Sequence, residues 1–324
     1  MKKYKTYTAK KLKLPRRLLF FFAVAAIIFA VTVIIGNILK TRVETVKENS
    51  DTTYTLETEK AQMETIMQTA EHDSALSAVS AGHLATEGIK DANGVREIIS
   101  QLKAGGYNAV SFAVNSDTGE FTYASPALQE ISRLPASEKL FSYELLKEAA
   151  SAAKTSGMRM SAVMCSSADT DIDSAVAAEL YSAGFDEIII TGFESDAPDD
   201  STVSRINSYV EALRKSAPVD FGVLLSDSVL SDSKNAPFIE KIFAKTEFLA
   251  IDMRNADSEK ASSLAENIQG SFSAYLLRPL LRGDNAETAL AVRAALTGAS
   301  INACQYISSP EKPAEETTAN ATEG

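Results

Sequence analysis

Short apolar runs rich in β-branched residues alternate, between residues 76 and 308, with segments whose apolar positions recur three and four residues apart. The runs predict eight strands, which are Leu76–Ala81, Asn108–Val114, Arg159–Cys165, Glu187–Thr191, Asp220–Leu225, Phe248–Asp252, Ala274–Leu277 and Ser300–Cys304. Runs this apolar are typical of strands that helices cover on both faces, as in a parallel sheet. The pattern therefore predicts an α/β fold.

Seven helices are predicted between these strands, and the last begins at Asp284 with Glu287 three residues on, the spacing of a capping box. This count favours a closed (β/α)8 barrel of the TIM type over an open doubly wound sheet of about five or six strands. The first strand is the least strongly indicated of the eight, since residues Ser74–Gly82 are mostly Ala and Ser. Without this strand, the open doubly wound sheet would again be favoured. A glycine-rich dinucleotide motif and a Walker loop are both missing from the sequence.

An uncharged run, Leu18–Leu39, precedes the barrel. Its 22 residues reach roughly 33 Å as a helix, enough to cross a hydrocarbon core of about 30 Å. Ala23–Ala25 has the small-x-small look of a signal-peptide cleavage site, but cutting there would leave a very short apolar core. We therefore favour a single transmembrane anchor over a cleaved signal. Basic residues flank its N-terminal end, which predicts a cytoplasmic N-terminus and an extracytoplasmic body.

Charge and composition divide the chain further. The predicted parts are a basic cytoplasmic tail (1–17), the anchor (18–39), a partly helical linker (40–75), the barrel (76–308) and a disordered tail (309–324). The whole chain carries a net charge of −11, but residues 1–17 hold eight bases and no acid, so residues 18–324 carry 24 bases against 43 acids, or −19. A body this acidic argues against a nucleic-acid partner.

The cysteines and histidines are few. Cys165 and Cys304 belong to no Cys-x-x-Cys or Cys/His cluster, and His72 and His83 lie far from them in sequence. A disulfide scaffold and a structural zinc site are both disfavoured. We favour two buried free thiols, while a single bridge between them stays open. His83 follows the first predicted strand, so it can reach the mouth of a barrel.

Polar residues follow the ends of the predicted strands, where the functional face of such a barrel forms. Among these polar residues, the candidate substrate contacts are Asn115, Asp117, Arg254, Arg278 and Tyr306. The candidate catalytic carboxylates are Glu194, Asp227 and Asp252.

Glycoside hydrolysis requires two carboxyl groups about 5–5.5 Å apart for retention or about 6.5–9.5 Å apart for inversion. Glu194 is the predicted general acid and Asp252 the predicted nucleophile or base. Acids are so frequent in this body that finding one after several strands is also expected by chance. A metal site made of Asp117, Asp227 and Asp252 is less favoured than a solvated acidic rim, and the sequence predicts no metal and no cofactor.

Two segments carry a family resemblance. Asn108–Ser125, NAVSFAVNSDTGEFTYAS, resembles the second-strand motif N-A-V-V-I-D-V-K-D-D-D-G-x-V-T-Y-P-S of a bacterial family of "putative glycoside hydrolase" barrels, largely a domain of unknown function. Gly184–Ile188, GFDEI, is similar to the start of that family's fourth strand, and Leu277–Gly283 and Gly298–Tyr306 are weaker matches. The resemblance covers residues 76–308 and implies a (β/α)8 barrel with a carbohydrate-related ancestry.

The departures from that family fall at the expected catalytic positions. Its second-strand aspartate and lysine correspond to Ala113 and Asn115, and its fourth-strand aspartate and arginine to Thr191 and Glu194. The seventh-strand tryptophan corresponds to Leu280, and the whole chain has no Trp, the side chain on which sugars stack best.

Two hypotheses follow. The favoured one is a non-hydrolytic, membrane-anchored barrel on the outer face of a bacterial membrane that binds envelope polysaccharide or a protein partner. The other is an active glycoside hydrolase with relocated carboxylates. A receptor for a soluble ligand is a third possibility, which would need a deep apolar pocket.

Overall fold

The computed structural model describes residues 72, 75–116, 119–132, 140–167, 169–193, 198–273, 275–282, 286–298, 301 and 304–307. The predicted anchor (18–39), nearly all of the predicted linker (40–75) and the predicted C-terminal tail lie outside these ranges. Within the described ranges, no helix is long and apolar enough to cross a membrane.

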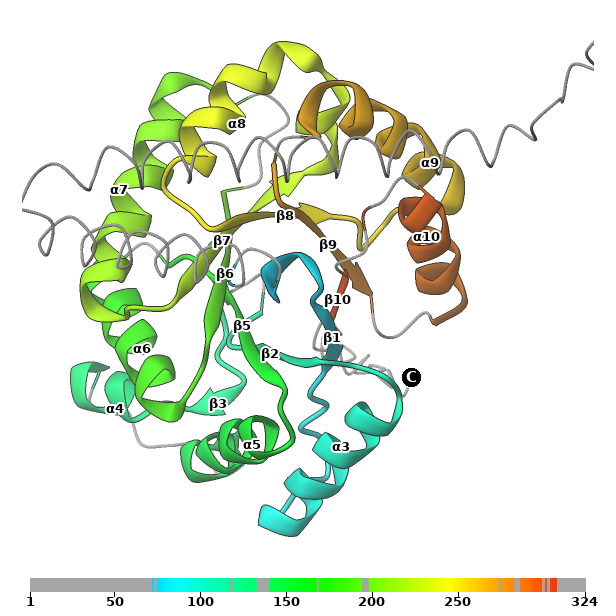
Figure 1. The fold of residues 1–324 in the computed structure, drawn as a ribbon. Coiled ribbons are helices and arrows are strands. Elements are labelled where there is room, and N and C mark those ends of the chain that lie inside the picture. The colour runs from blue at the N-terminus through cyan, green and yellow to red at the C-terminus, as the bar shows by residue number, and fades with distance from the viewer. Residues whose placement is uncertain are drawn as a thin grey trace, which may run out of the picture. The chain divides into compact units, whose positions relative to one another are not determined.

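Eight parallel strands close into a barrel, in the order β1, β2, β5, β6, β7, β8, β9, β10 and back to β1 (Figure 1). Their bounds are β1 Ser80–His83, β2 Ala109–Ala113, β5 Arg159–Cys165, β6 Glu187–Thr191, β7 Asp220–Ser226, β8 Phe248–Asp252, β9 Leu277–Arg282 and β10 Cys304–Ile307. The predicted closed barrel is confirmed. Its first strand was predicted at Leu76–Ala81, whereas β1 is Ser80–His83 and residues 75–77 are helical.

Helices surround the barrel on the outside (Figure 1). Those that connect consecutive barrel strands are α3 Ala92–Ala104, α5 Tyr143–Thr155, α6 Thr170–Ala183, α7 Asp200–Ser216, α8 Ala236–Phe243, α9 Ser258–Asn267 and α10 Ala286–Gly298. The shorter helical segments are α4 Pro126–Ser132, η1 Asp227–Ser231, η2 Ser233–Asn235 and η3 Ile268–Phe272. A two-stranded sheet of β3 Tyr123–Ala124 and β4 Phe141–Ser142 accompanies α4 between β2 and α5.

Aspartates begin four of the outer helices. Asp91, Asp169, Asp199 and Asp257 are the N-caps of α3, α6, α7 and α9, and each carboxylate accepts a hydrogen bond from a backbone N–H of the first turn. Such a cap satisfies a donor that the helix itself leaves unpaired, and it stabilises a helix by about 1 kcal/mol. Part of the acidity of this body therefore has a local structural cause.

The matched family motifs lie mainly in the scaffold. Asn108 joins β2 to the segment that leads into β1, because its amide accepts from Ser80 N (2.7 Å) and donates to Ala78 O (2.8 Å). Gly184, at φ +103°, ends α6 in the left-handed conformation that favours glycine. Asp186 then accepts from Met160 N (2.8 Å), which ties the start of β6 to the start of β5.

The barrel interior is apolar on one side. Leu76, Val163, Ile189, Leu224, Phe248, Ala250 and Leu280 form a buried cluster. Phe248 lies directly over Gly222 of β7, where an added Cβ would come within 2.2 Å of the ring. Only glycine fits beneath this ring, so a large side chain on one strand faces the smallest residue on the next.

A buried ion pair lies at the start of strands β6 and β9. The side chains of Arg278 and Glu187 are 1% and 0% exposed, and Arg278 Nη1 donates to Glu187 Oε1. The same guanidinium donates to Leu76 O (3.2 Å) and stacks 4.0 Å from the ring centroid of Phe248.

Arg159 supports the same carboxylate from β5, with Nη2 3.3 Å from Glu187 Oε2 and 2.6 Å from Asp220 Oδ2. Burial alone would raise the pKa of Glu187, but Arg278 and Arg159, with their hydrogen bonds, outweigh it and hold that pKa below its usual value. Glu187 is therefore a charged residue in the interior of the barrel.

The last two strands lie further along the chain than predicted. The pattern predicted strands at Ala274–Leu277 and Ser300–Cys304, whereas β9 is Leu277–Arg282 and β10 is Cys304–Ile307. Arg278 and Pro279 break the apolar pattern, and prolines are normally rare inside sheets. The charge of Arg278 is tolerated inside the strand because Glu187 neutralises it.

We predict that Glu187→Gln destabilises the protein by about 3–5 kcal/mol, because it leaves the guanidinium of Arg278 buried without a full counter-charge. Chemical denaturation followed by circular dichroism measures this, since the chain has no Trp for fluorescence. The paired replacement Glu187→Leu with Arg278→Met should cost less than the sum of its single changes. An unchanged unfolding midpoint for Glu187→Gln would contradict this account of the core.

Candidate functional site

The carboxyl ends of the strands form the mouth of the barrel, and Asp252 lies there at the end of β8. Arg254, two residues on, holds both oxygens of this carboxylate. Its Nε and backbone N–H donate to Oδ1 at 2.9 and 3.1 Å, and its Nη2 donates to Oδ2 at 2.8 Å. The two side chains are only 22% and 13% exposed, so the pair is partly shielded from water.

Asp227 faces a different partner. It is the first residue of η1, after β7, and its Oδ2 forms an ion pair with Lys260 Nζ of α9. Together with Ser231 and Asp257 these two residues line a cavity of about 340 Å³ between η1 and α9. Asp227 and Asp252 thus have separate basic partners, and Asp252 is not among the residues that line this cavity.

Two predicted site residues cannot be placed. Glu194 and Asp117 lie outside the described residues. The Glu194–Asp252 pair therefore stays a prediction, and so does Asp117 as a substrate contact.

Asn115 lies at the mouth, but both ends of its amide are used by the fold. Its Nδ2 donates to Cys165 O (2.9 Å), and its Oδ1 accepts from Cys165 N (2.7 Å). The side chain is thereby joined to the last residue of β5, beyond the end of β2 itself. At the position where the resembled family has lysine, this chain has an asparagine whose side chain, which we call the Asn115 staple, connects the ends of β2 and β5 by hydrogen bonds.

Two other predicted positions were wrong. Arg278 is the second residue of β9, at the opposite end of the strand from the mouth, and its guanidinium is engaged by Glu187. Tyr306 lies within β10, not after it, and its ring packs edge-on against Tyr107 with centroids 5.8 Å apart. Both errors follow from strands that were predicted too early in the chain.

His83 lies at the mouth of the barrel but is not among the predicted site residues. It is the last residue of β1 and the register partner of Ser111 on β2. Within the described part of the chain, its Nδ1 is buried without a hydrogen-bond partner. Burial lowers the pKa of His83 from its usual 6.5 to about 4, so that the imidazole is neutral at pH 7. In the sequence, only its position just after the first predicted strand indicated that His83 could reach the mouth.

A polar group of side chains continues from Ser111 into the barrel. Gln305 of β10 donates from Nε2 to Ser111 Oγ (2.9 Å) and to Ser161 Oγ of β5 (2.8 Å). β10 and β5 are not neighbours in the barrel, so these bonds cross its interior. Gln305 Oε1 is buried without a hydrogen-bond partner among the described residues. One quadrant of the interior is thus polar, opposite to the apolar cluster around Phe248.

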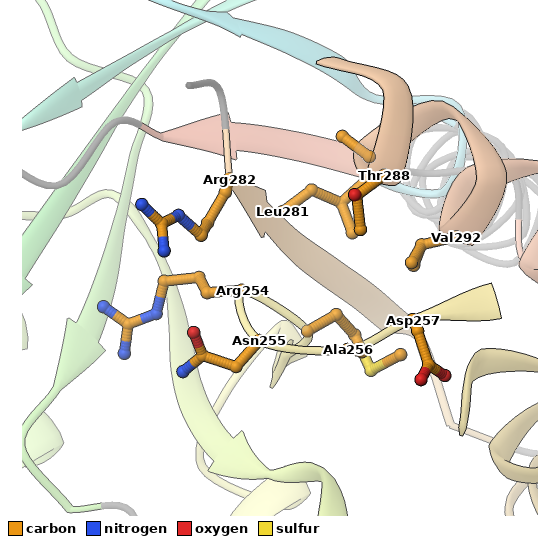
Figure 2. Close-up of a pocket in the computed structure, with 10 residues that line it drawn as sticks. Arg254, Asn255, Ala256, Asp257, Leu281, Arg282, Thr288 and Val292 are labelled. Atoms are coloured by element: carbon orange, nitrogen blue, oxygen red, sulfur yellow. The ribbon is translucent and has the colours of Figure 1, made fainter. Parts of the chain in front are cut away.

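A cavity of about 280 Å³ lies beside Asp252, between the segment that follows β8 and the end of β9 with α10 (Figure 2). Its lining residues are Met253, Arg254, Asn255, Ala256, Asp257, Leu281, Arg282, Thr288, Ala289 and Val292. Figure 2 shows the side chains of Arg254 and Arg282 extending to the same side, away from Val292 and Asp257.

Cys165 and Cys304 form no disulfide, as predicted, but only one of the two predicted buried thiols is buried. Cys304 is buried, and burial raises the pKa of its thiol to about 11. Cys165 is only half-buried, at the end of β5. Among the described residues, no group of three or more His, Cys, Asp and Glu side chains is placed to hold a metal ion.

The comparisons with known proteins concern the fold. No family model and no curated protein sequence matches the chain. Among solved structures, it is similar to a "putative alpha-L-fucosidase" from Bacteroides thetaiotaomicron VPI-5482, with a TM-score of 0.53, 10% identity, and 71% of this chain and 87% of that chain covered. The β-mannanase AaManA of glycoside hydrolase family GH113, from Alicyclobacillus acidocaldarius, gives a TM-score of 0.48, 9% identity, and coverage of 72% and 87%. These structural neighbours are glycoside hydrolase (β/α)8 barrels, and at these identities the likeness shows the fold alone.

We predict that His83 makes the protein less stable in mild acid. The folded-state pKa of about 4 lies below the ordinary 6.5, so the unfolded chain takes up a proton in this window and the folded chain does not. The free energy of unfolding should therefore fall as the pH drops from 6.5 to about 4, with a contribution from His83 of about 3 kcal/mol.

Denaturation of the wild type and of His83→Gln at several pH values isolates this contribution, because the titrating carboxylates are common to both proteins. The difference in stability between the two should shift in favour of the variant as the pH falls. Parallel curves would show that His83 is not held neutral.

Proposed function

We propose that this protein is a membrane-anchored, extracytoplasmic barrel that binds a polysaccharide of the cell envelope at its mouth without hydrolysing it. The observation that carries the proposal is the fork between Arg254 and Asp252, in which both oxygens of the candidate nucleophile accept hydrogen bonds. A carboxylate held in this way is oriented toward its arginine, and three of its about four lone-pair sites already accept hydrogen bonds.

The other strand ends support the same reading. Ala113 provides no reactive group, Asn115 is committed to the backbone of Cys165, and Thr191 is 3% exposed at the end of β6. The glycoside-hydrolase-like fold provides the carbohydrate connection, and the cavity beside Asp252 provides space for a sugar.

The membrane location of this proposal rests on the sequence. The uncharged segment Leu18–Leu39 has the length and apolarity of a spanning helix, and the basic residues of 1–17 favour a cytoplasmic N-terminus. The mouth of the barrel would then meet polysaccharide outside the cell.

The competing function is hydrolysis by Glu194 and Asp252. The position of Asp252 at the end of β8 is the observation in its favour, since catalytic residues of such barrels lie at strand ends.

The purified full-length protein, in detergent, separates the two functions on a panel of envelope and storage polysaccharides. We expect retention of at least one polysaccharide and no release of reducing ends above the buffer blank. Glu194→Gln and Asp252→Asn should leave that absence of release unchanged. Release of sugar by the wild type that Glu194→Gln abolishes would overturn the binding proposal and establish the hydrolase.

A further inference from the structure

The cavity between β8 and β9 has a chemistry of its own. Its inner wall is apolar, with Leu281, Ala289 and Val292 on one side and Met253 on the other. Asn255 and Thr288 add an amide and a hydroxyl, which suit the hydroxyl groups of a sugar. Its volume of about 280 Å³ is at the lower end for a small-molecule site, a size that suits one sugar unit of a chain.

Two arginines stand at the mouth end of this cavity. Arg254 follows β8 and Arg282 ends β9, and the two strands are joined past the end of β8 by Met253 N donating to Leu280 O (3.0 Å). Both guanidinium groups extend in the same direction in Figure 2. Arginine matches the planar, two-oxygen geometry of carboxylate and phosphate groups.

The acids near the cavity have structural partners. Asp257, at the other end of the labelled group in Figure 2, caps α9 through Lys260 N (2.8 Å). Asp252 is held by Arg254. Because a guanidinium carries five N–H donors, one arginine can contact several acceptors at once, and the acid group of a ligand can be one of them.

From this arrangement we infer that the cavity is a subsite for an anionic sugar, with Arg254 and Arg282 binding its carboxylate or phosphate and the apolar wall contacting its ring. The inference rests on the proposed polysaccharide-binding function and names its ligand class. An acidic body with a net charge of −19 repels polyanions at long range, so the contact depends on these two side chains at short range.

The experiment measures binding of the full-length protein in detergent to three polymers of matched length. Polygalacturonate presents carboxylates, poly(glycerol phosphate) presents phosphates, and mannan is neutral. We expect at least one anionic polymer to bind more tightly than mannan, with an affinity that falls as salt rises. Preference for the first identifies the carboxylate as the recognised group, and preference for the second identifies the phosphate.

Substitutions locate the binding. Arg282→Gln and Arg254→Gln should each weaken binding of the preferred anionic polymer by about tenfold, equivalent to about 1.4 kcal/mol. Asp252→Asn should tighten it, because a competing carboxylate charge is removed. Arg282→Lys should recover part of the loss, since it restores the charge but not the two-pronged geometry.

Lys103→Gln is the matched control. Lys103 is exposed in the last turn of α3, and its replacement changes the net charge by the same amount without touching the cavity. The basic residues 1–17 attract polyanions equally in every variant, so only differences from the wild type are interpreted. Thermal unfolding followed by circular dichroism shows which variants are folded. If Arg282→Gln does not fold, the comparison of Arg282→Lys with the wild type takes its place.

Several outcomes would overturn the inference. One is anionic binding that survives both arginine changes or responds equally to Lys103→Gln. Another is tighter binding of mannan, unaffected by Arg282→Gln, which would leave the proposed function standing and refute the anionic subsite. Absence of binding to all three polymers, while another neutral polysaccharide of the wider panel is retained, would refute the subsite in the same way. If no polysaccharide of either set binds, the proposed function itself fails.

Discussion

The buried contact between Glu187 and Arg278 is the constraint on which the rest of the barrel depends. Two full charges in an interior cost several kcal/mol each unless they meet and their other hydrogen-bonding groups are satisfied. Arg278 meets this condition through Glu187, the carbonyl of Leu76 and the face of Phe248. The contact thus links β6, β8 and β9 with the segment that precedes β1. It also requires Gly222, because the Phe248 ring that supports the guanidinium occupies the space of a side chain on β7.

The two ends of the barrel use charge in different ways. At the start of the strands, charges are buried and matched, and they hold the strands together. At the mouth, Asp252 and Arg254 are partly exposed and belong to the same short segment, so their contact holds little of the fold together. A change to this pair leaves the core closed, whereas a change to the Glu187–Arg278 pair opens it.

Much of the fold could be predicted from the sequence. β5, β6 and β8 have the predicted bounds, because their apolar runs end at glycine, serine or charged residues that mark turns. β9 was predicted too early because a buried arginine inside a strand needs an acidic partner. The partner of Arg278 is Glu187, which is 91 residues away in the chain. Contacts of that separation leave no local pattern.

The candidate site was less predictable. The sequence placed Asp252 correctly at the end of the sixth barrel strand and Arg254 two residues beyond it, but the hydrogen bonds between them depend on side-chain rotamers that spacing does not encode. The polar group of Ser111, Ser161 and Gln305 was not predicted at all, because single polar residues in apolar runs do not reveal which way they face. His83 was marked only by its position after the first strand, since its burial and lowered pKa depend on neighbours from the whole barrel.

The hydrogen bonds of the Asn115 staple have a consequence for the seam between β2 and β5. Its amide pairs with both the N–H and the carbonyl of Cys165, so it acts as one more rung between β2 and β5 after the strands themselves have stopped pairing. Lysine at this position, as in the resembled family, would offer donors only and would leave the N–H of Cys165 without its acceptor, at a cost of about 1–3 kcal/mol. Lysine at position 115 would therefore weaken the contact between β2 and β5. A change at position 115 is therefore expected to act first on the stability of the barrel, whatever it does at the mouth.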